Sequence, residues 1–297
     1  MSICGEAQLE RCLAALEQQR EGLEFDVVVA AAPTLGDLAQ VRQRFPRVQI
    51  IVNEDVTSPI QLAASAVTAA DGELILLTED HCVPDSGWVA ALSRGLGEGR
   101  GAVGGIVDPL DEGTMSPFDW AFYYVDFFRY QAPQRRGAVH SLSSCNVGYR
   151  KTDLESLEGW WRGSFHETRV HAALTKRVGP LWMEPDARVE AGRKVLRGDA
   201  LRERFAFGRI YACRRIDKPN GAMRLWRALA SPLLPLLLLA RLASAARRDT
   251  ATARRFRRSL PDLALLVLAW SAGETLGYWT GQAPANANAA PERSPAE

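Results

Sequence analysis

Residues 74–84, LILLTEDHCVP, place three titratable side chains at the end of an apolar run. Glu79, Asp80 and His81 follow this run and precede Cys82. Carboxylate oxygens bind hard divalent ions, and imidazole suits Mn²⁺ better than Mg²⁺. The cluster therefore predicts a divalent-metal site at the end of a buried strand. The alternative is a polar turn that closes a hydrophobic strand.

A second cluster lies in residues 165–179, FHETRVHAALTKRVG, whose pattern predicts a helix that ends at Gly179. His166 and Glu167 together with His171 resemble a zinc-binding motif. The two histidines are five residues apart, however, which places them about 140° apart around a helix. This spacing argues against a zinc ion shared by both.

The elements that must position these residues alternate between strands and helices. β-Branched or apolar runs at 25–32, 48–53 and 73–78 predict strands, and residues 6–19, 35–45 and 59–70 predict helices. This alternation is typical of βαβ units in a parallel sheet, where ligands bind beyond the carboxyl ends of the strands. Glu79, Asp80 and His81 occupy such an end, which favours the functional interpretation over a simple turn.

Less regular elements follow. We expect a helix at 87–96, a strand at 101–109 with paired glycines, and a strand and turn within 138–151. Residues 116–130 hold eight aromatic side chains and predict an aromatic helix. Residues 185–192 predict a short strand.

Charge is distributed unevenly along the 297 residues, although the net charge is only +1. Residues 1–187 carry 16 Lys and Arg against 26 Asp and Glu, whereas residues 188–258 carry 19 against 5. The basic segment predicts contact with phosphates or an anionic lipid surface. Nucleic acid is a weaker interpretation, because apolar stretches follow directly.

The cysteines and the N-terminus bear on the compartment. Five cysteines without CxxC spacing argue against a disulfide framework and favour a reducing compartment. No basic region followed by an apolar core marks a signal peptide at the N-terminus. We therefore expect the catalytic portion to stay in the cytoplasm. Together with the C-terminal segments described next, this predicts a location at the cytoplasmic face of the cell membrane.

The C-terminal region alternates apolar and basic segments. Apolar stretches at 228–240 and 263–273 flank the segment 247–258, which holds six arginines. Neither stretch is long enough to span about 30 Å of hydrocarbon as an uninterrupted helix. We expect a shallow hairpin or interfacial helices joined by a loop at 247–258. Alternatively, both stretches are helices packed on the globular part.

The order of these motifs resembles the family 2 glycosyltransferases with the A-type nucleotide-sugar fold. The resemblance rests on AADGELILLTEDHCVPDSGWV, VGGIV, SCNVGYRK and FHETRVHAALTKRVG, and covers residues 8–282. It implies an α/β fold with a mostly parallel central sheet flanked by helices. Residues 268–281, LAWSAGETLGYWTG, also resemble the C-terminal segment of membrane-associated bacterial members.

The resemblance implies roles for the two clusters. Glu79 and His81 occupy the outer positions of the family's Asp-x-Asp motif, which holds Mn²⁺ or Mg²⁺ against the donor's diphosphate, with Asp80 between them. Glu167 matches the first acid of the family's acidic motif and would be the catalytic base of an inverting transfer, while Thr168 replaces the second acid. A helix-surface glutamate beside Arg169 is the alternative.

Other matched positions would contact the two substrates. On the donor side the resemblance implies a nucleotide-sugar site with Thr34, Asp37, Asp80, Arg204 and Arg209. On the acceptor side it implies Gly105, Trp120, Asn146 and His166. Each has a plainer alternative: a bulge for the glycines, a turn for Asn146 and core packing for the aromatic helix.

The sequence also departs from the family. MSICGEAQ replaces the usual first strand, Ala30 to Ala32 stand where an acidic residue is usual, and the helix before Asp71 lacks an Arg-Asn pair.

We therefore expect a metal-dependent, hexosyltransferase-like glycosyltransferase that acts on a glycan or lipid-linked acceptor. The alternatives are a degenerate, non-catalytic binding protein or a nucleotidyltransferase. The expected domains are a catalytic domain at 1–190, a basic connector at 191–225, apolar helices at 226–282 and a disordered tail at 283–297.

Overall fold

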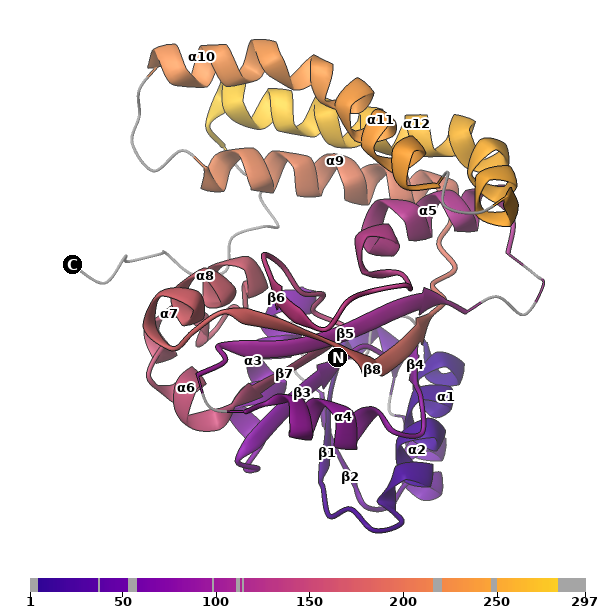
Figure 1. Cartoon of the computed structure of the whole chain (residues 1–297), viewed down its shortest axis with the longest axis vertical. Helices are drawn as coiled ribbons and strands as arrows, with labels where there is room; N and C mark the ends of the chain where they lie inside the picture. The colour runs from indigo at the N-terminus through magenta and orange to yellow at the C-terminus, as the bar shows by residue number, and fades with distance from the viewer. Residues whose placement is uncertain are drawn as a thin grey trace. The chain divides into compact units, whose positions relative to one another are not determined.

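The structure is a computed structural model that describes residues 5–36, 38–52, 58–97, 99–110, 113, 115–215, 221–246 and 250–282. The chain divides into two compact units (Figure 1). The first, an α/β unit, combines residues 1–110 with 130–192. The second, a helical unit, combines the described residues within 111–129 with those within 193–282.

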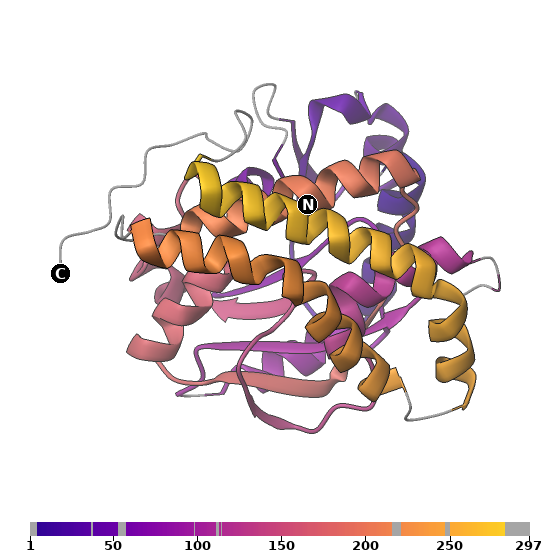
Figure 2. The same ribbon diagram turned by 90° about the horizontal axis from the view of Figure 1, so that it is seen from above.

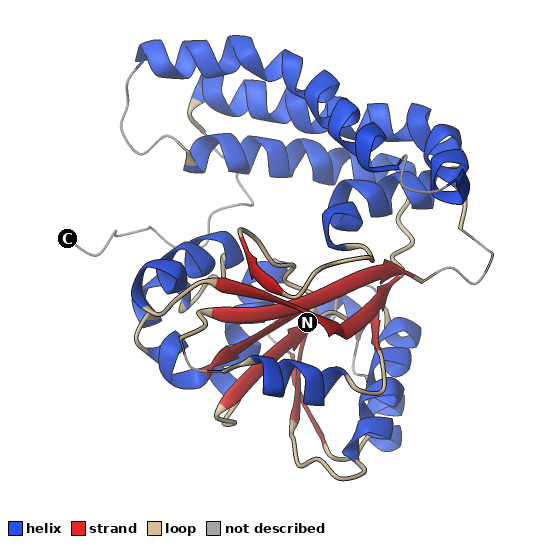
Figure 3. Cartoon of the chain, viewed as in Figure 1, coloured by secondary structure: helices blue, strands red, loops and turns tan. Residues whose placement is uncertain are grey.

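The α/β unit contains two sheets (Figure 3). The strands are β1 (Val27–Ala31), β2 (Val48–Val52), β3 (Leu74–Thr78), β4 (Cys82–Pro84), β5 (Ala102–Pro109), β6 (Gly137–Val139), β7 (Asn146–Arg150) and β8 (Leu181–Ala191). β1 and β2 form a parallel pair, and the larger sheet has the order β3-β7-β5-β8-β4, with β6 also paired to β8.

The larger sheet is mixed, so the prediction of a mostly parallel sheet is wrong. β5 and β8 are parallel, whereas β7 runs antiparallel to both β3 and β5, and β4 and β6 run antiparallel to β8. The strand–helix alternation that predicted parallel pairing ends at β3. β4 follows β3 after three residues, too few for a crossover helix.

The helices of the α/β unit cover the sheets. They are α1 (Glu6–Glu17), α2 (Ala39–Arg44), α3 (Pro59–Ala69), α4 (Trp88–Gly95), α6 (Lys151–Glu155), α7 (Glu158–Trp161) and α8 (Glu167–Arg177). Apolar residues of α1 and α2 bury β1 and β2, including Leu13 and Val41.

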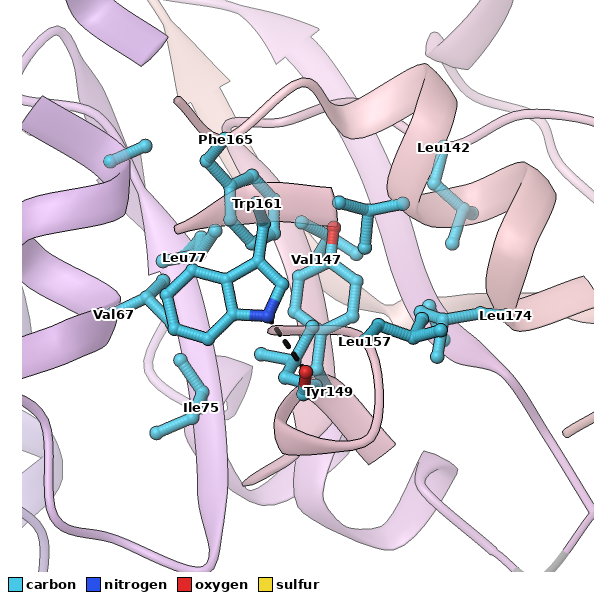
Figure 4. Close-up of a cluster of buried hydrophobic side chains, with 14 of the residues drawn as sticks. Val67, Ile75, Leu77, Leu142, Val147, Tyr149, Leu157, Trp161, Phe165 and Leu174 are labelled. Atoms are coloured by element: carbon cyan, nitrogen blue, oxygen red, sulfur yellow. Dashed lines mark hydrogen bonds between the residues drawn. The ribbon is translucent and has the colours of Figure 1, made fainter. Parts of the chain in front are cut away.

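A larger core lies between α3, α7, α8 and the mixed sheet. Tyr149, Trp161 and Phe165 form its aromatic centre (Figure 4). The polar atom of the indole is satisfied inside this core, because Trp161 Nε1 donates to the Leu154 carbonyl at 2.7 Å.

The helical unit is built from α5 (Pro117–Phe127), α9 (Arg197–Arg214), α10 (Gly221–Ala230), α11 (Leu234–Ala246) and α12 (Thr250–Thr280). Its core joins Trp120 and Tyr124 of α5 to Phe256, Leu263 and other apolar residues of α12. α9 and α12 approach closely at glycines. A Cβ on Gly273 would lie 2.0 Å from the Phe205 carbonyl oxygen, which only glycine permits.

The segment 247–258 is not the loop that the sequence predicts, because α12 begins at Thr250 and includes four of its six arginines. Phe256 and Ser259 are buried and extend the apolar stripe of α12 towards its N-terminus. No helix in the described ranges has both the length and the apolar character needed to cross a membrane. The tail 283–297, which we predict to be disordered, lies outside the described residues.

Candidate functional site

The turn between β3 and β4 brings the three titratable residues into contact. His81 Nε2 lies 3.6 Å from Glu79 Oε2, and His81 Nδ1 lies 3.5 Å from Asp80 Oδ1. The turn is closed by the backbone, because the Cys82 amide donates to the Glu79 carbonyl at 3.0 Å. The side chains of Asp80 and His81 are buried, whereas Glu79 is partly exposed. The cluster therefore opens to solvent at Glu79.

Ser144 fixes the orientation of Glu79. Its hydroxyl donates to Glu79 Oε1 at 3.0 Å, which leaves Oε2 on the side of His81. The contact follows from strand pairing, because Thr78 at the end of β3 lies opposite Asn146 at the start of β7. The loop before β7 therefore meets the turn after β3.

This arrangement fits a divalent ion held by Glu79 and His81. Metal-binding histidines usually donate their second ring N–H to a carboxylate, and Asp80 lies beside Nδ1 in that position. Ligands at about 2.0–2.6 Å from one ion lie roughly 3 to 3.7 Å apart, which matches the spacing of Oε2 and Nε2. Two protein ligands leave further positions for phosphate oxygens.

The residues that the structure describes do not form a complete metal cage. Within the described residues, no group of three or more His, Cys, Asp and Glu side chains is arranged to hold a metal ion. Glu79 and His81 are therefore suited to an ion that takes its other ligands from water and a bound phosphate group.

The start of α8 places Glu167 at the same edge of the α/β unit. Residues 70–73 join the end of α3 to the start of β3, and the helix packs back along the strand. The N-terminus of α3 therefore lies near the carboxyl end of β3. There the Phe165 amide donates to the Ile60 carbonyl at 2.8 Å, which ties the start of α8 to the start of α3. Glu167 is the first residue of α8, and His166 is its buried N-cap.

A buried pair lies one turn further along α8. The Tyr149 hydroxyl and His171 Nε2 are 2.8 Å apart, and the tyrosine ring packs against Phe165. Burial lowers the pKa of His171 to about 4, so the imidazole is neutral at pH 7. Burial, and secondarily the charge of Glu167, raises the pKa of Tyr149.

Asn146 is buried, and both polar atoms of its side chain form hydrogen bonds within the protein. Its Oδ1 accepts from Trp88 Nε1 at 2.8 Å, and its Nδ2 donates to the carbonyls of Ile106 and Ala187 at 2.8 and 3.0 Å. These bonds span the irregularity where the pairing of β5 and β8 shifts register. Strand packing therefore accounts for Asn146 without an acceptor.

Strand packing also accounts for Gly105. A Cβ at this position would lie 1.7 Å from the carbonyl oxygen of Ala187, and one on Gly104 would lie 2.7 Å from that of Asn146. The two glycines of β5 therefore permit β7 and β8 to approach β5 closely.

The predicted donor residues at the first strand are partly described. Thr34 is exposed and follows β1 in a short 3₁₀ turn, at the carboxyl end of the parallel pair. Asp37 lies outside the described residues.

The other predicted residues belong to the helical unit. Arg204 is buried and donates to Asp126 at 2.6 Å, with its guanidinium 4.9 Å from the Phe122 ring centre. Arg209 Nε donates to the Gln282 carbonyl at 2.9 Å. Trp120 packs in the helical core with Tyr123 and Tyr124.

Ser144 and the Tyr149–His171 pair are the residues that the sequence analysis missed. Ser144 is 65 residues away from Glu79 in the chain, so only the pairing of β3 with β7 brings them together. His171 of the Tyr149–His171 pair could have been predicted from the sequence, because it follows Glu167 by four residues and therefore lies on the same face of the helix.

One comparison with known proteins identifies a family. A family model described as Glycosyl transferase family 2 matches residues 3–158, which is more than half of the chain. No curated protein matches at a significant level.

Solved structures are similar in fold. The chain resembles the mannosyltransferase PcManGT from Pyrobaculum calidifontis, in complex with GDP-Man and Mn²⁺, with a TM-score of 0.54 and 14% identity over 92% of this chain and 86% of that one. The TM-score is 0.46 for S. aureus TarS 1-349 with UDP-GlcNAc, at 14% identity over 95% and 92% of the two chains. It is 0.47 for GalNAc-T7 with UDP, GalNAc and Mn²⁺, at 12% identity over 64% of this chain and 41% of that one.

Proposed function

The chain belongs to glycosyl transferase family 2, and from that membership we propose that it is a metal-dependent enzyme that moves a sugar from a nucleotide-sugar donor to an acceptor hydroxyl with inversion. The pairing of Glu79 Oε2 with His81 Nε2 at the end of β3 carries the proposal of a metal site. The Mn²⁺ in the PcManGT complex supports the choice of ion.

The chain's residues have separate tasks in this proposal. Glu79 and His81 would hold the ion, with Ser144 and Asp80 orienting them, and an ion held there would supply positive charge to offset that of the departing diphosphate. Glu167 accepts the proton of the acceptor hydroxyl as that oxygen attacks the anomeric carbon. Thr34, exposed beyond β1, contacts the donor nucleotide in this proposal.

We place the reaction at the cytoplasmic face of the cell membrane, with a lipid-linked or cell-envelope glycan as the acceptor. The excess of Lys and Arg over Asp and Glu in residues 188–258 supports this location, because such a segment is attracted to anionic lipid headgroups.

Donor binding tests the metal site. Sugar nucleotides, including GDP-mannose and UDP-N-acetylglucosamine, should bind more tightly when Mn²⁺ is present, measured by titration calorimetry. Glu79→Gln or His81→Gln should remove that Mn²⁺-dependent gain, because each variant loses a ligand of the ion. Glu73→Gln, an exposed carboxylate just before β3, and His140→Gln, an exposed imidazole, should leave the gain intact.

The outcomes separate the alternatives. An unchanged Mn²⁺ effect in both site variants would return the TEDH segment to a simple turn. Binding of nucleoside triphosphates in preference to sugar nucleotides would favour a nucleotidyltransferase. The absence of binding to any donor would favour a degenerate protein.

A further inference from the structure

The helix α10 is oriented with its arginines towards the protein. Arg224 donates from Nε to the Tyr278 carbonyl at 3.0 Å and from Nη2 to the Trp279 carbonyl at 2.9 Å. Arg227 donates to the Arg215 carbonyl at 2.7 Å. Tyr278 and Trp279 belong to the last turn of α12, whose carbonyls have no partner within their own helix. The polar side of α10 is therefore fixed against α9 and α12.

The opposite side of α10 is apolar and exposed. Trp226 and Leu229 are 68% and 64% exposed, and Met223 and Leu225 are also largely exposed. Helices of soluble proteins usually turn their apolar side inward and their charges outward. In α10 the apolar side chains face outward and the arginines face the protein. An exposed apolar surface of this kind is typical of a site that contacts a partner or a membrane.

The exposed side continues beyond α10. Leu233, Leu236 and Leu237 follow at spacings of three to four residues through the 3₁₀ turn 231–233 and the first turn of α11, and each is 49% exposed or more. We call the set Leu225, Trp226, Leu229, Leu233, Leu236 and Leu237 the apolar ridge. Other leucines of α11, such as Leu238 and Leu242, pack on the helical core and fix the ridge in place.

The neighbouring helix α12 adds positive charge. α10 and α11 both pack against α12 (Figure 2). Along α12, exposed positions recur every three or four residues, beginning with Arg254, Arg257 and Arg258 and continuing to Leu265 and Leu268. Trp279 is exposed near its end. The helical unit therefore exposes leucine, tryptophan and arginine side chains on helices that pack against one another.

We propose that the apolar ridge of α10 and α11 enters the interfacial layer of an anionic lipid bilayer, with the arginines of α12 at the lipid phosphates. Leucine contributes apolar burial, arginine pairs with phosphate, and tryptophan prefers the boundary between headgroups and acyl chains. Because Arg224 and Arg227 hold the other side of α10, the helix inserts by one face and lies in the plane of the membrane. This inference deepens the proposed location and does not depend on the transfer chemistry.

Vesicle co-flotation of the full-length protein tests the proposal. The wild-type protein should float with vesicles that contain phosphatidylglycerol. Leu229→Ser with Leu236→Ser should lower partitioning at least about tenfold, because two side chains that would enter the bilayer become polar. Both positions are exposed, so the thermal unfolding midpoint should not change. The matched control is Leu23→Ser with Leu74→Ser, two exposed leucines of the α/β unit.

Three results would overturn the proposal. One is equal flotation of the ridge variant and the wild type. Another is an equal loss of flotation in the control variant. The third is a wild-type protein that forms dimers in sedimentation velocity, does not float, and becomes monomeric on Leu229→Ser with Leu236→Ser, because the ridge would then contact a second copy. Mn²⁺-dependent donor binding, measured on the same samples, reports the transfer site separately.

Discussion

Replacement of Glu167 should affect the rate of sugar transfer without affecting the affinity for the donor. A glutamine at this position keeps the size of the side chain but cannot accept the proton of an attacking hydroxyl. Glu167→Gln should therefore lower the transfer rate by at least about 100-fold while donor affinity is retained. Product formation and calorimetric donor binding, measured on the same sample, test both parts.

The control for Glu167→Gln is Glu155→Gln, which removes an exposed carboxylate of α6. It should keep full activity. A fully active Glu167→Gln enzyme would contradict the assignment, and His166, the N-cap of the same helix, would be the next base to test.

His171 makes stability depend on pH in a defined window. Its pKa is lowered from 6.5 to about 4 in the folded protein, so between these values the unfolded chain binds a proton that the folded chain does not. Stability should therefore be complete above pH 6.5 and should fall as pH drops towards 4. At about 1.36 kcal/mol per pKa unit, the loss is on the order of 3 kcal/mol.

Chemical denaturation at several pH values measures this dependence. His171→Gln should flatten the decline between pH 6.5 and 4, whatever its effect on stability at pH 7. His140→Gln removes an exposed histidine and should keep the wild-type slope. If the wild type and His171→Gln share one slope, another group causes the decline.

At the scale of elements, apolar periodicity predicted most of the helices and strands. The strands at 25–32, 48–53 and 73–78 correspond to β1, β2 and β3, with ends that differ by two residues or fewer. Strand direction was not predictable in the same way, because it depends on which strands pair. β7 lies antiparallel between β3 and β5 although their sequences are far from it in the chain.

Tertiary pairing also explains what the sequence could not assign within the site. Glu79, His81 and Glu167 are candidates that residue type and motif order alone can nominate. Ser144 reaches Glu79 only through the register of β3 with β7. Asn146 resembled a substrate contact in the motif, yet Trp88 and two carbonyls satisfy its amide. A local pattern cannot show whether a polar side chain is already satisfied.

The start of α12 shows how charge obscured a helix. Six arginines within 247–258 resemble an exposed loop. Phe256, Ser259 and Leu263 are nevertheless spaced by three and four residues and are all buried. This spacing continues the stripe of α12 into the arginine-rich segment, and packing against α5 stabilises a helix there.

At the scale of the whole molecule, charge is separated along the chain. Residues 1–187 carry ten more acidic than basic residues, and residues 188–258 carry fourteen more basic than acidic ones. An anionic bilayer should therefore attract the helical unit and repel much of the α/β unit. The attraction and the apolar ridge contribute to membrane binding in different ways, which salt can distinguish.

Raising NaCl from about 0.1 M to 1 M shortens the Debye length from about 10 Å to 3 Å and removes most attraction between exposed charges and lipid phosphates. The wild-type protein should remain bound to anionic vesicles at high salt, because apolar burial of the ridge is not screened. Replacing Arg254, Arg257 and Arg258 by glutamine should cost about 1 kcal/mol for each arginine at low salt and almost nothing at high salt. Leu229→Ser with Leu236→Ser should show the reverse, with weak binding at low salt and complete release at high salt. If high salt alone releases the wild-type protein, the ridge does not enter the bilayer, and binding is electrostatic.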